Sequence, residues 1–175
     1  MDTRELRAHI REFPNYPKQG VNFKDISPLL ANHQSFRRAV HGIARGVCRM
    51  GASKMLAIDA RGFVLGTALA WKMRIPLLLA RKKGKLPGAT VFSKYALEYG
   101  TAVLEAQVDS VKAGERILIA DDVLATGGTA CAAAELVEKL GGKVVGFAFI
   151  LELSFLHGRK ALEGYDVFSL LSFDQ

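Results

Sequence analysis

The stretch "RILIADDVLATGGTA", from Arg116 to Ala130, places two neighbouring carboxylates between an apolar run and a glycine-rich turn. The apolar run is typical of a buried strand, and the alanine-rich segment after the turn favours a helix. A strand, a tight turn and a helix in this order indicate one unit of a parallel sheet. Ligands of such sheets bind beyond the carboxyl ends of the strands, which is where Asp121 and Asp122 fall.

The same alternation of short apolar runs with helical segments continues on both sides of this stretch. Because parallel strands need crossover helices, the alternation predicts an α/β fold with a mostly parallel sheet that helices cover on both faces. The predicted strands are 54–59, 75–81, 116–120, 143–153 and 166–173, and the predicted helices are 34–50, 62–73, 127–142 and 155–162.

Two segments depart from this alternation. After a short N-terminal helix, the run "FPNYPKQGVNFKDISP" contains Pro14, Pro17 and Pro28, which exclude a continuous helix and predict an ordered irregular segment. Residues 95–108 alternate partially around Gly100 and predict a β-hairpin, preceded by a loop over residues 82–94.

Composition and charge narrow the class of protein. A length of 175 residues predicts a single domain with one well-buried core. The charged N-terminus has no apolar signal region, and the run Val144 to Leu151 is shorter than the ~20 residues of a membrane span, so we expect a cytoplasmic protein. Cys48 and Cys131 form no C-x-x-C pair, and the four histidines lack metal-ligand spacing. The formal charge of +7 fits either nucleic acid or a small polyanionic ligand.

The turn from Ala125 to Thr129 is suited to an anion. Its glycines allow the backbone to approach a ligand closely, the helix start offers free N–H groups with partial positive charge, and two threonines add hydroxyl donors. A helix N-cap without a ligand would show the same turn. The acidic pair separates the two interpretations, because carboxylates repel a phosphate unless they bind neutral hydroxyls or a cation. A ribose 5-phosphate satisfies both requirements, and neither a P-loop nor a G-x-G-x-x-G turn is present.

Four segments together resemble the type I phosphoribosyltransferases, in the branch that uses adenine. They are "ILIADDVLATGGT", "FPNYPKQGVNFKDISPLL", "IDARGF" and "RKKGKLPG" followed by "LEYG", and they stand in the family's order between Phe13 and Leu140. The resemblance implies the type I phosphoribosyltransferase fold in one domain over residues 1–175. This fold has a central, mostly parallel β-sheet flanked by helices. It adds a small N-terminal hood that binds the base, over residues 1–33, and a mobile β-hairpin lid, over residues 81–100.

The activity that the resemblance implies is transfer of a phosphoribosyl group from phosphoribosyl pyrophosphate to adenine, giving AMP and pyrophosphate in purine salvage. It also implies Mg²⁺, held mainly by the substrate, with Asp121 and Asp122 as candidate protein ligands. The expected assembly is a homodimer in which the lid reaches the adjacent subunit, with no nucleic-acid or membrane partner.

The phosphate groups of the substrate account for most of the implied site residues. The 5′-phosphate would bind to Ala125, Thr126, Gly127, Gly128 and Thr129, and the pyrophosphate to Asp59, Ala60, Arg61, Arg81, Lys82 and Lys85. In the family a cis peptide precedes the arginine of the pyrophosphate loop, which predicts a cis bond between Asp59 and Ala60. Asp121, Asp122 and Arg61 are implied to be catalytic. The acidic pair would hold the ribose hydroxyls and stabilise a developing oxocarbenium ion.

Adenine would be bound by Asn22, Phe23, Lys24 and Val123, with Phe23 stacking on the base. Glu98, near purine N7, is the implied general acid or base, and Tyr99 on the lid would help to cover the site. The chain departs from the family at Lys24, where arginine is frequent, and at Val123, where leucine is common. Base selectivity is therefore less firmly implied than phosphate recognition.

Two alternatives remain at this point. A phosphoribosyltransferase for a 6-oxopurine or another base would share the phosphate loop, but it would not be expected to carry the "FPNYP" to "DISP" segment. A regulator that senses phosphoribosyl pyrophosphate and binds nucleic acid through its basic surface would bind RNA or DNA with steep salt dependence and show no turnover.

Overall fold

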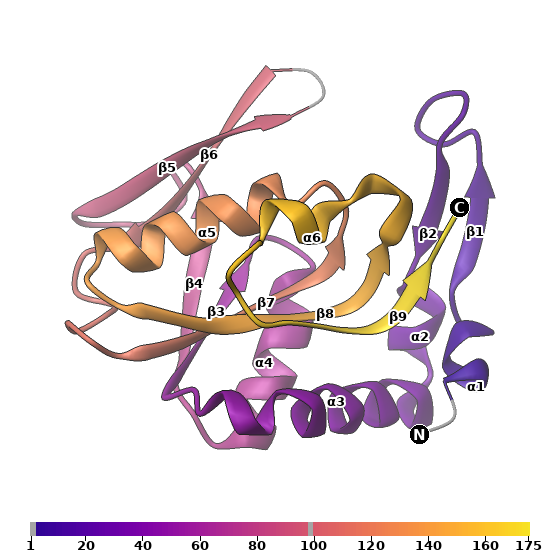
Figure 1. Cartoon of the computed structure of the whole chain (residues 1–175), viewed down its shortest axis with the longest axis horizontal. Helices are drawn as coiled ribbons and strands as arrows, with labels where there is room; N and C mark the ends of the chain where they lie inside the picture. Colours follow the sequence, from indigo (N-terminus) through magenta and orange to yellow (C-terminus); the bar gives the residue numbers. More distant parts are fainter. Residues whose placement is uncertain (1–2, 98–99) are drawn as a thin grey trace.

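The computed structural model describes residues 3–97 and 100–175. In this part of the chain, strands form a seven-stranded sheet in the order β5-β6-β4-β3-β7-β8-β9 and a separate two-stranded sheet, β1-β2 (Figure 1). The strands are β1 Arg11–Pro14, β2 Asn22–Asp25, β3 Lys54–Ile58, β4 Leu77–Lys82, β5 Thr90–Leu97, β6 Gly100–Gln107, β7 Arg116–Leu124, β8 Lys143–Leu153 and β9 Val167–Phe173. The helices are α1 Arg4–Arg7, α2 Ser27–Ala31, α3 His33–Val47, α4 Gly62–Met73, α5 Gly128–Lys139 and α6 Gly158–Ala161, with 3₁₀ turns at Cys48–Met50 and Ser154–Leu156.

The large sheet is parallel from β4 through β3, β7 and β8 to β9. The β5–β6 hairpin is antiparallel, and it joins the sheet through a second antiparallel pairing, in which Arg81 and Lys82 of β4 pair with Glu105 and Leu104 of β6. The predicted α/β fold with a mostly parallel sheet is confirmed. Strand β7 runs four residues further than predicted and ends at Leu124. Asp121 and Asp122 therefore lie within the strand, near its carboxyl end, rather than after it.

The apolar core lies on both faces of the sheet. Side chains alternate across a strand, so that Leu118 and Ala120 of β7 face α3 and α4 while Ile117 and Ile119 face α5. Figure 1 shows α5 on one side of the sheet and α3 on the other. None of the helices in the described part of the chain combines the length and apolarity that crossing a bilayer requires.

The N-terminal segment is more regular than predicted, because β1 and β2 form an antiparallel pair where we expected irregular structure. Asp25 stabilises the end of this hairpin by accepting hydrogen bonds from Ser27 N–H (2.9 Å), Ser27 Oγ (2.6 Å) and Arg11 Nη2 (2.7 Å). Phe173, near the C-terminus, packs against the N-terminal segment: the Arg7 guanidinium lies 4.2 Å and Lys24 Nζ 5.0 Å from its ring centroid. Four-residue strands are too short to produce a readable alternation, so the hairpin left no signal in the sequence.

The hairpin β5–β6 is confirmed, but β5 begins at Thr90 and the preceding loop is correspondingly shorter than predicted. The inward face of β5 contains Ser93, which is 1% exposed and donates a hydrogen bond to Glu135 of α5. Lys139 of α5 also donates to the carbonyl oxygen of Phe92 (3.0 Å). A polar residue on the buried face hides the apolar alternation by which a strand is recognised.

Candidate active site

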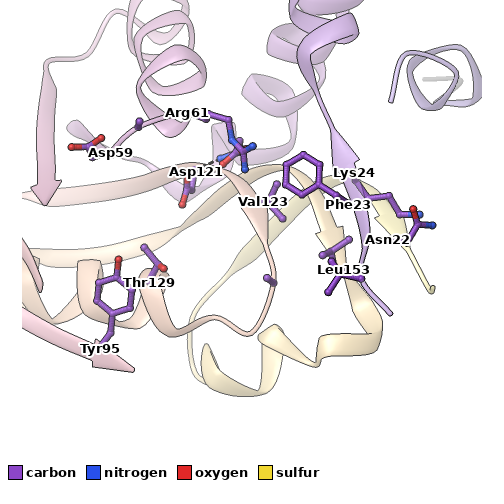
Figure 2. Close-up of a pocket in the computed structure, with 14 residues that line it drawn as sticks. Asn22, Phe23, Lys24, Asp59, Arg61, Tyr95, Asp121, Val123, Thr129 and Leu153 are labelled. Carbon is purple, nitrogen blue, oxygen red and sulfur yellow. Dashed lines mark hydrogen bonds and ion pairs between the residues drawn. The ribbon is translucent and has the colours of Figure 1, made fainter. Parts of the chain in front are cut away.

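A cavity of about 450 Å³ opens at the carboxyl ends of β3 and β7 (Figure 2). Segments far apart in the sequence meet there: the hood strand β2, the turn after β3, the hairpin strand β5 and the ends of β7 and β8. The cavity is lined by Val21, Asn22, Phe23, Lys24, Asp59, Ala60, Arg61, Tyr95, Asp121, Asp122, Val123, Ala125, Thr129 and Leu153. Residues predicted for base, ribose and pyrophosphate binding therefore share one cavity.

The acidic pair lies at the centre of this cavity. Asp122 is 5% exposed, and its Oδ2 lies 2.6 Å from Arg61 Nε, yet within the described residues this oxygen accepts no hydrogen bond. Asp121 Oδ1 accepts a hydrogen bond from the Asp122 N–H (2.9 Å). Burial raises the pKa of Asp121 well above its ordinary value, and the adjacent Asp122 carboxylate raises it further. Burial and mutual repulsion make these two carboxylates unfavourable in the free protein. They suit a ligand that brings hydroxyl groups or a cation.

The turn after β3 brings a cation to the acidic pair. The peptide bond between Asp59 and Ala60 is cis, as predicted from the family resemblance. Gly62 allows this turn to lie close to the end of β7, because a Cβ at this position would lie 2.7 Å from Asp121 Oδ1. The Arg61 guanidinium also lies 5.6 Å from the ring centroid of Phe23, between the acidic pair and the hood.

The predicted phosphate loop surrounds a second, smaller cavity of about 60 Å³ that shares Asp121, Val123, Ala125 and Thr129 with the first. All five predicted residues, Ala125 to Thr129, line it. Gly127 adopts φ +88°, a left-handed conformation that favours glycine, and α5 begins at the next residue. The start of a twelve-residue helix thus faces a space bounded by backbone N–H groups, which is the arrangement that binds a phosphate.

An apolar slot forms at the hood side of the cavity, between Phe23, Val123 and Leu153 (Figure 2). Tyr16 supports Phe23 from outside in an edge-to-face contact, with the ring centroids 5.5 Å apart. Asn22 lines the cavity with a buried Oδ1 that has no hydrogen-bond partner within the described residues. The slot offers a flat hydrophobic wall, which suits an aromatic heterocycle, while the Asn22 amide is directed towards Glu12 of β1, to which its Nδ2 donates (2.7 Å).

Lys24 lines the cavity, but its ammonium group is engaged elsewhere. Nζ lies 2.9 Å from Glu12 Oε2, and the side chain is only 2% exposed. This ion pair joins β2 to β1 within the hood. A direct contact between the Lys24 charge and a base therefore stays a prediction.

Of the basic residues of the predicted lid, Arg81 and Lys82 contact Asp59 at the edge of the cavity. Arg81 Nε lies 3.5 Å from Asp59 Oδ2, and the Lys82 N–H lies 3.5 Å from the same oxygen. Arg81, Lys82 and Lys85 do not line the described cavity. Glu98 and Tyr99 lie outside the described residues, so their predicted roles stay predictions.

Tyr95 and Leu153 line the cavity without having been predicted. Tyr95 stands two residues after the buried Ser93, on the same face of β5, so strand alternation could have pointed to it once β5 was known to begin at Thr90. Leu153 is the last residue of β8, next to the end of β7, and its position at the carboxyl edge was the available signal.

The fold is that of a phosphoribosyltransferase, and the family model of the phosphoribosyl transferase domain matches residues 30–172. The chain is 50% identical over 169 residues to the adenine phosphoribosyltransferase of Geobacter metallireducens, covering 97% of this chain and 99% of the relative. The structure of the enzyme from Thermoanaerobacter pseudethanolicus matches with a TM-score of 0.95 at 44% identity, over 98% of this chain and 100% of that one. The Saccharomyces cerevisiae enzyme, complexed with an imino-altritol bisphosphate and adenine, matches with a TM-score of 0.91 at 34% identity, over 97% and 98%. The chain belongs to the adenine phosphoribosyltransferase family.

Proposed function

We propose that this protein transfers the phosphoribosyl group of phosphoribosyl pyrophosphate to adenine, releasing AMP and pyrophosphate in purine salvage. One observation carries the proposal: two adjoining cavities, which share four lining residues, join a phosphate loop at a helix start, an acidic pair and an aromatic-walled slot. These three parts match the 5′-phosphate, the ribose diol and the purine. Family membership over nearly the whole chain supports the same reaction.

The substrate would lie across the carboxyl ends of β7 and β8. Its 5′-phosphate is held by the backbone of Ala125 to Thr129 and the hydroxyls of Thr126 and Thr129, and its 2′- and 3′-hydroxyls donate to Asp121 and Asp122. Phe23 and Val123 then enclose the adenine ring. This orientation places C1′ between the acidic pair and the base slot, which is the geometry needed for attack on C1′.

The reaction is a displacement with inversion at C1′. The purine nitrogen forms the new C–N bond as the C–O bond to pyrophosphate breaks, and the pyrophosphate leaves with that electron pair. Positive charge develops on the ribose, and the carboxylates of Asp121 and Asp122 stabilise it. A proton must leave the purine, and Glu98 is the proposed acceptor near N7.

The leaving pyrophosphate needs positive charge around it. Arg61, the backbone of Asp59 and Ala60, and the lid residues Arg81, Lys82 and Lys85 supply donors and cations on this side of the site. The oxygen donors of the acidic pair fit a hard divalent cation such as Mg²⁺, although Asp122 Oδ2 is ion-paired with Arg61 Nε (2.6 Å). When bound, mainly by substrate oxygens, Mg²⁺ would neutralise charge on the pyrophosphate.

The proposed assembly is a cytoplasmic homodimer in which the lid, residues 81–100, closes over the site of the adjacent subunit, with no nucleic-acid or membrane partner. The domain is a single unit over residues 1–175, with the hood over residues 1–33. Exposed apolar side chains on α4, Trp71 at 82% and Val64 at 44%, support burial of this helix against a second copy. Light scattering of the purified protein tests the dimer.

A coupled pyrophosphate-release assay with adenine and phosphoribosyl pyrophosphate, with and without Mg²⁺, tests the reaction. We expect turnover that needs Mg²⁺, and adenine to be the best substrate in a panel with hypoxanthine, guanine and xanthine. If adenine were the poorest of the four, the base assignment would be wrong. Salt-dependent binding of nucleic acid without turnover would favour the regulator instead.

A further inference from the structure

Glu105 is a buried carboxylate on β6 that does not line the cavity; it is 5% exposed. Its Oε1 accepts hydrogen bonds from the backbone N–H groups of Lys85 (2.9 Å) and Leu86 (3.0 Å), and its Oε2 from Thr90 Oγ1 (3.4 Å). Burial acts to raise the pKa of Glu105, but the N–H groups of Leu86, Lys85 and Gly84 outweigh it and lower the pKa. An ionised side chain therefore holds the turn between β4 and β5.

This turn is connected to the active site through Arg81. Arg81 Nη1 donates to the carbonyl oxygen of Lys85 (3.1 Å), and Arg81 Nε lies 3.5 Å from Asp59 Oδ2. Asp59 lines the cavity and forms the cis peptide bond with Ala60. Glu105 also stands directly opposite Arg81 across β4 and β6. A continuous path of contacts thus runs from Glu105 through Lys85 and Arg81 to the turn proposed to bind pyrophosphate.

We infer that Glu105 is a positioning residue for phosphoribosyl pyrophosphate: it fixes the backbone of residues 84–86 so that the basic turn faces the Asp59–Ala60 loop. The inference rests on the proposed function of that loop. A turn that is already ordered loses less conformational entropy when the pyrophosphate binds, so its anchor acts on the affinity for this substrate. Adenine binds on the hood side of the cavity, away from the path, and its binding is unaffected.

Steady-state kinetics of Glu105→Ala test this role. We expect KM for phosphoribosyl pyrophosphate to rise about tenfold, and KM for adenine to stay within about twofold of wild type. Glu105→Gln keeps a carbonyl oxygen that can accept from Lys85 and Leu86, and should restore most of the affinity. Gln107→Ala is the matched control, because Gln107 lies on the same strand and donates to the carbonyl oxygen of Pro87 (3.2 Å) at the surface of the same loop. Its kinetics should match wild type.

Limited trypsin digestion without substrates gives a second readout. The sites after Lys82, Lys83 and Lys85 should be cut faster in Glu105→Ala than in wild type or Gln107→Ala, since the turn has lost its anchor. If the alanine variant does not fold, both measurements are made on Glu105→Asp, whose side chain is shorter by one methylene. For this variant we expect KM for phosphoribosyl pyrophosphate to rise about threefold.

Equal cleavage rates and an unchanged KM for phosphoribosyl pyrophosphate, in whichever of Glu105→Ala and Glu105→Asp folds, would overturn the inference. A wild-type protein that makes no AMP would instead refute the proposed function, and the digestion would still report whether Glu105 orders the turn.

Discussion

Two carboxylates, Asp121 near the end of β7 and Asp25 at the end of the hood hairpin, have opposite surroundings. Asp25 accepts hydrogen bonds from the hydroxyl and the N–H of Ser27, and these, with the Arg11 guanidinium, lower its pKa to about 2. Asp121 has a raised pKa because it is buried and faces the Asp122 carboxylate. The hood carboxylate is stabilised by the protein itself, whereas at Asp121 the hydrogen bond from the Asp122 N–H does not offset burial and repulsion, which leaves a ligand to stabilise the charge.

Other polar groups follow the same division. The buried side-chain atoms without a hydrogen-bond partner in the described residues are Asn22 Oδ1, Arg81 Nε, Asp122 Oδ2 and Ser169 Oγ. Two of these residues line the cavity, and Arg81 lies beside Asp59, which also lines it. Asp122 Oδ2 and Arg81 Nε each face one opposite charge, Arg61 Nε (2.6 Å) and Asp59 Oδ2 (3.5 Å). Native proteins leave few buried polar groups without hydrogen bonds, so three such groups at or beside the cavity suit a polar ligand.

The largest expected effect comes from Asp122→Asn, which removes a charge from the site and weakens the internal ion pair with Arg61 Nε (2.6 Å). We expect kcat/KM to fall at least about tenfold, or ~1.4 kcal/mol of transition-state stabilisation, because the ribose loses an acceptor and its developing charge loses a counter-ion. Pyrophosphate release measures it.

The matched control for Asp122→Asn is Glu152→Gln, a buried carboxylate on the neighbouring strand that is paired with Arg159 (2.8 Å) and does not line the cavity. This variant should lose stability but keep kcat/KM within about threefold. Equal kinetic losses in the two variants would contradict the division between ligand-facing and structural carboxylates.

The next largest effect concerns stability at the site. A raised folded-state pKa means that the native protein binds more protons than the unfolded chain, so its stability falls as pH rises above 3.8, the ordinary pKa of this group. Asp121→Asn removes this loss. We expect its Tm to equal that of wild type near pH 4 and to exceed it by about 3 °C at pH 8, while kcat/KM falls. A Tm difference independent of pH, measured by circular dichroism, would show that Asp121 is not destabilised.

Asp25→Asn should behave in the opposite way. The lowered pKa means that the Asp25 carboxylate stabilises the protein above pH 3.8 and that this stabilisation is lost as pH falls towards 2. The variant should melt about 3 °C below wild type at pH 7, with the difference shrinking below pH 4. Its kcat/KM should stay within about threefold of wild type, because Asp25 does not line the cavity. A tenfold loss of activity would place Asp25 in the site.

The sequence was most informative where burial sets the pattern. The apolar runs of β3 and β8 predicted their strands closely, and that of β7 predicted its start, because these strands are buried on both faces. Parallel strands bring their carboxyl ends to one edge, so Asp59 and Asp121 could be expected to meet. The phosphate loop followed from its glycines and its place before a helix.

The hood and the hairpin were less predictable because polar contacts between distant residues position them. The pairing of Arg11 with Asp25 depends on chain closure over fourteen residues, and the hydrogen bond from Ser93 to Glu135 joins two elements that periodicity cannot relate. Glu105 looks like any polar residue of a strand, and only the structure shows that it accepts hydrogen bonds from a turn some twenty residues away. Such side-chain to backbone contacts leave no period in the sequence.

The smallest expected effect tests whether the hairpin contributes to the substrate site at all. Tyr95 is the described hairpin residue that lines the cavity, on the side where Figure 2 shows Thr129. Tyr95→Phe keeps the ring that packs against the core and removes only the hydroxyl. A single neutral hydrogen bond to the substrate contributes about 1 kcal/mol, so we expect kcat/KM to fall about fivefold with Tm unchanged. If activity and Tm both matched wild type, Tyr95 would be a packing residue, and the unsatisfied polar groups of the site would belong to the sheet and the hood alone.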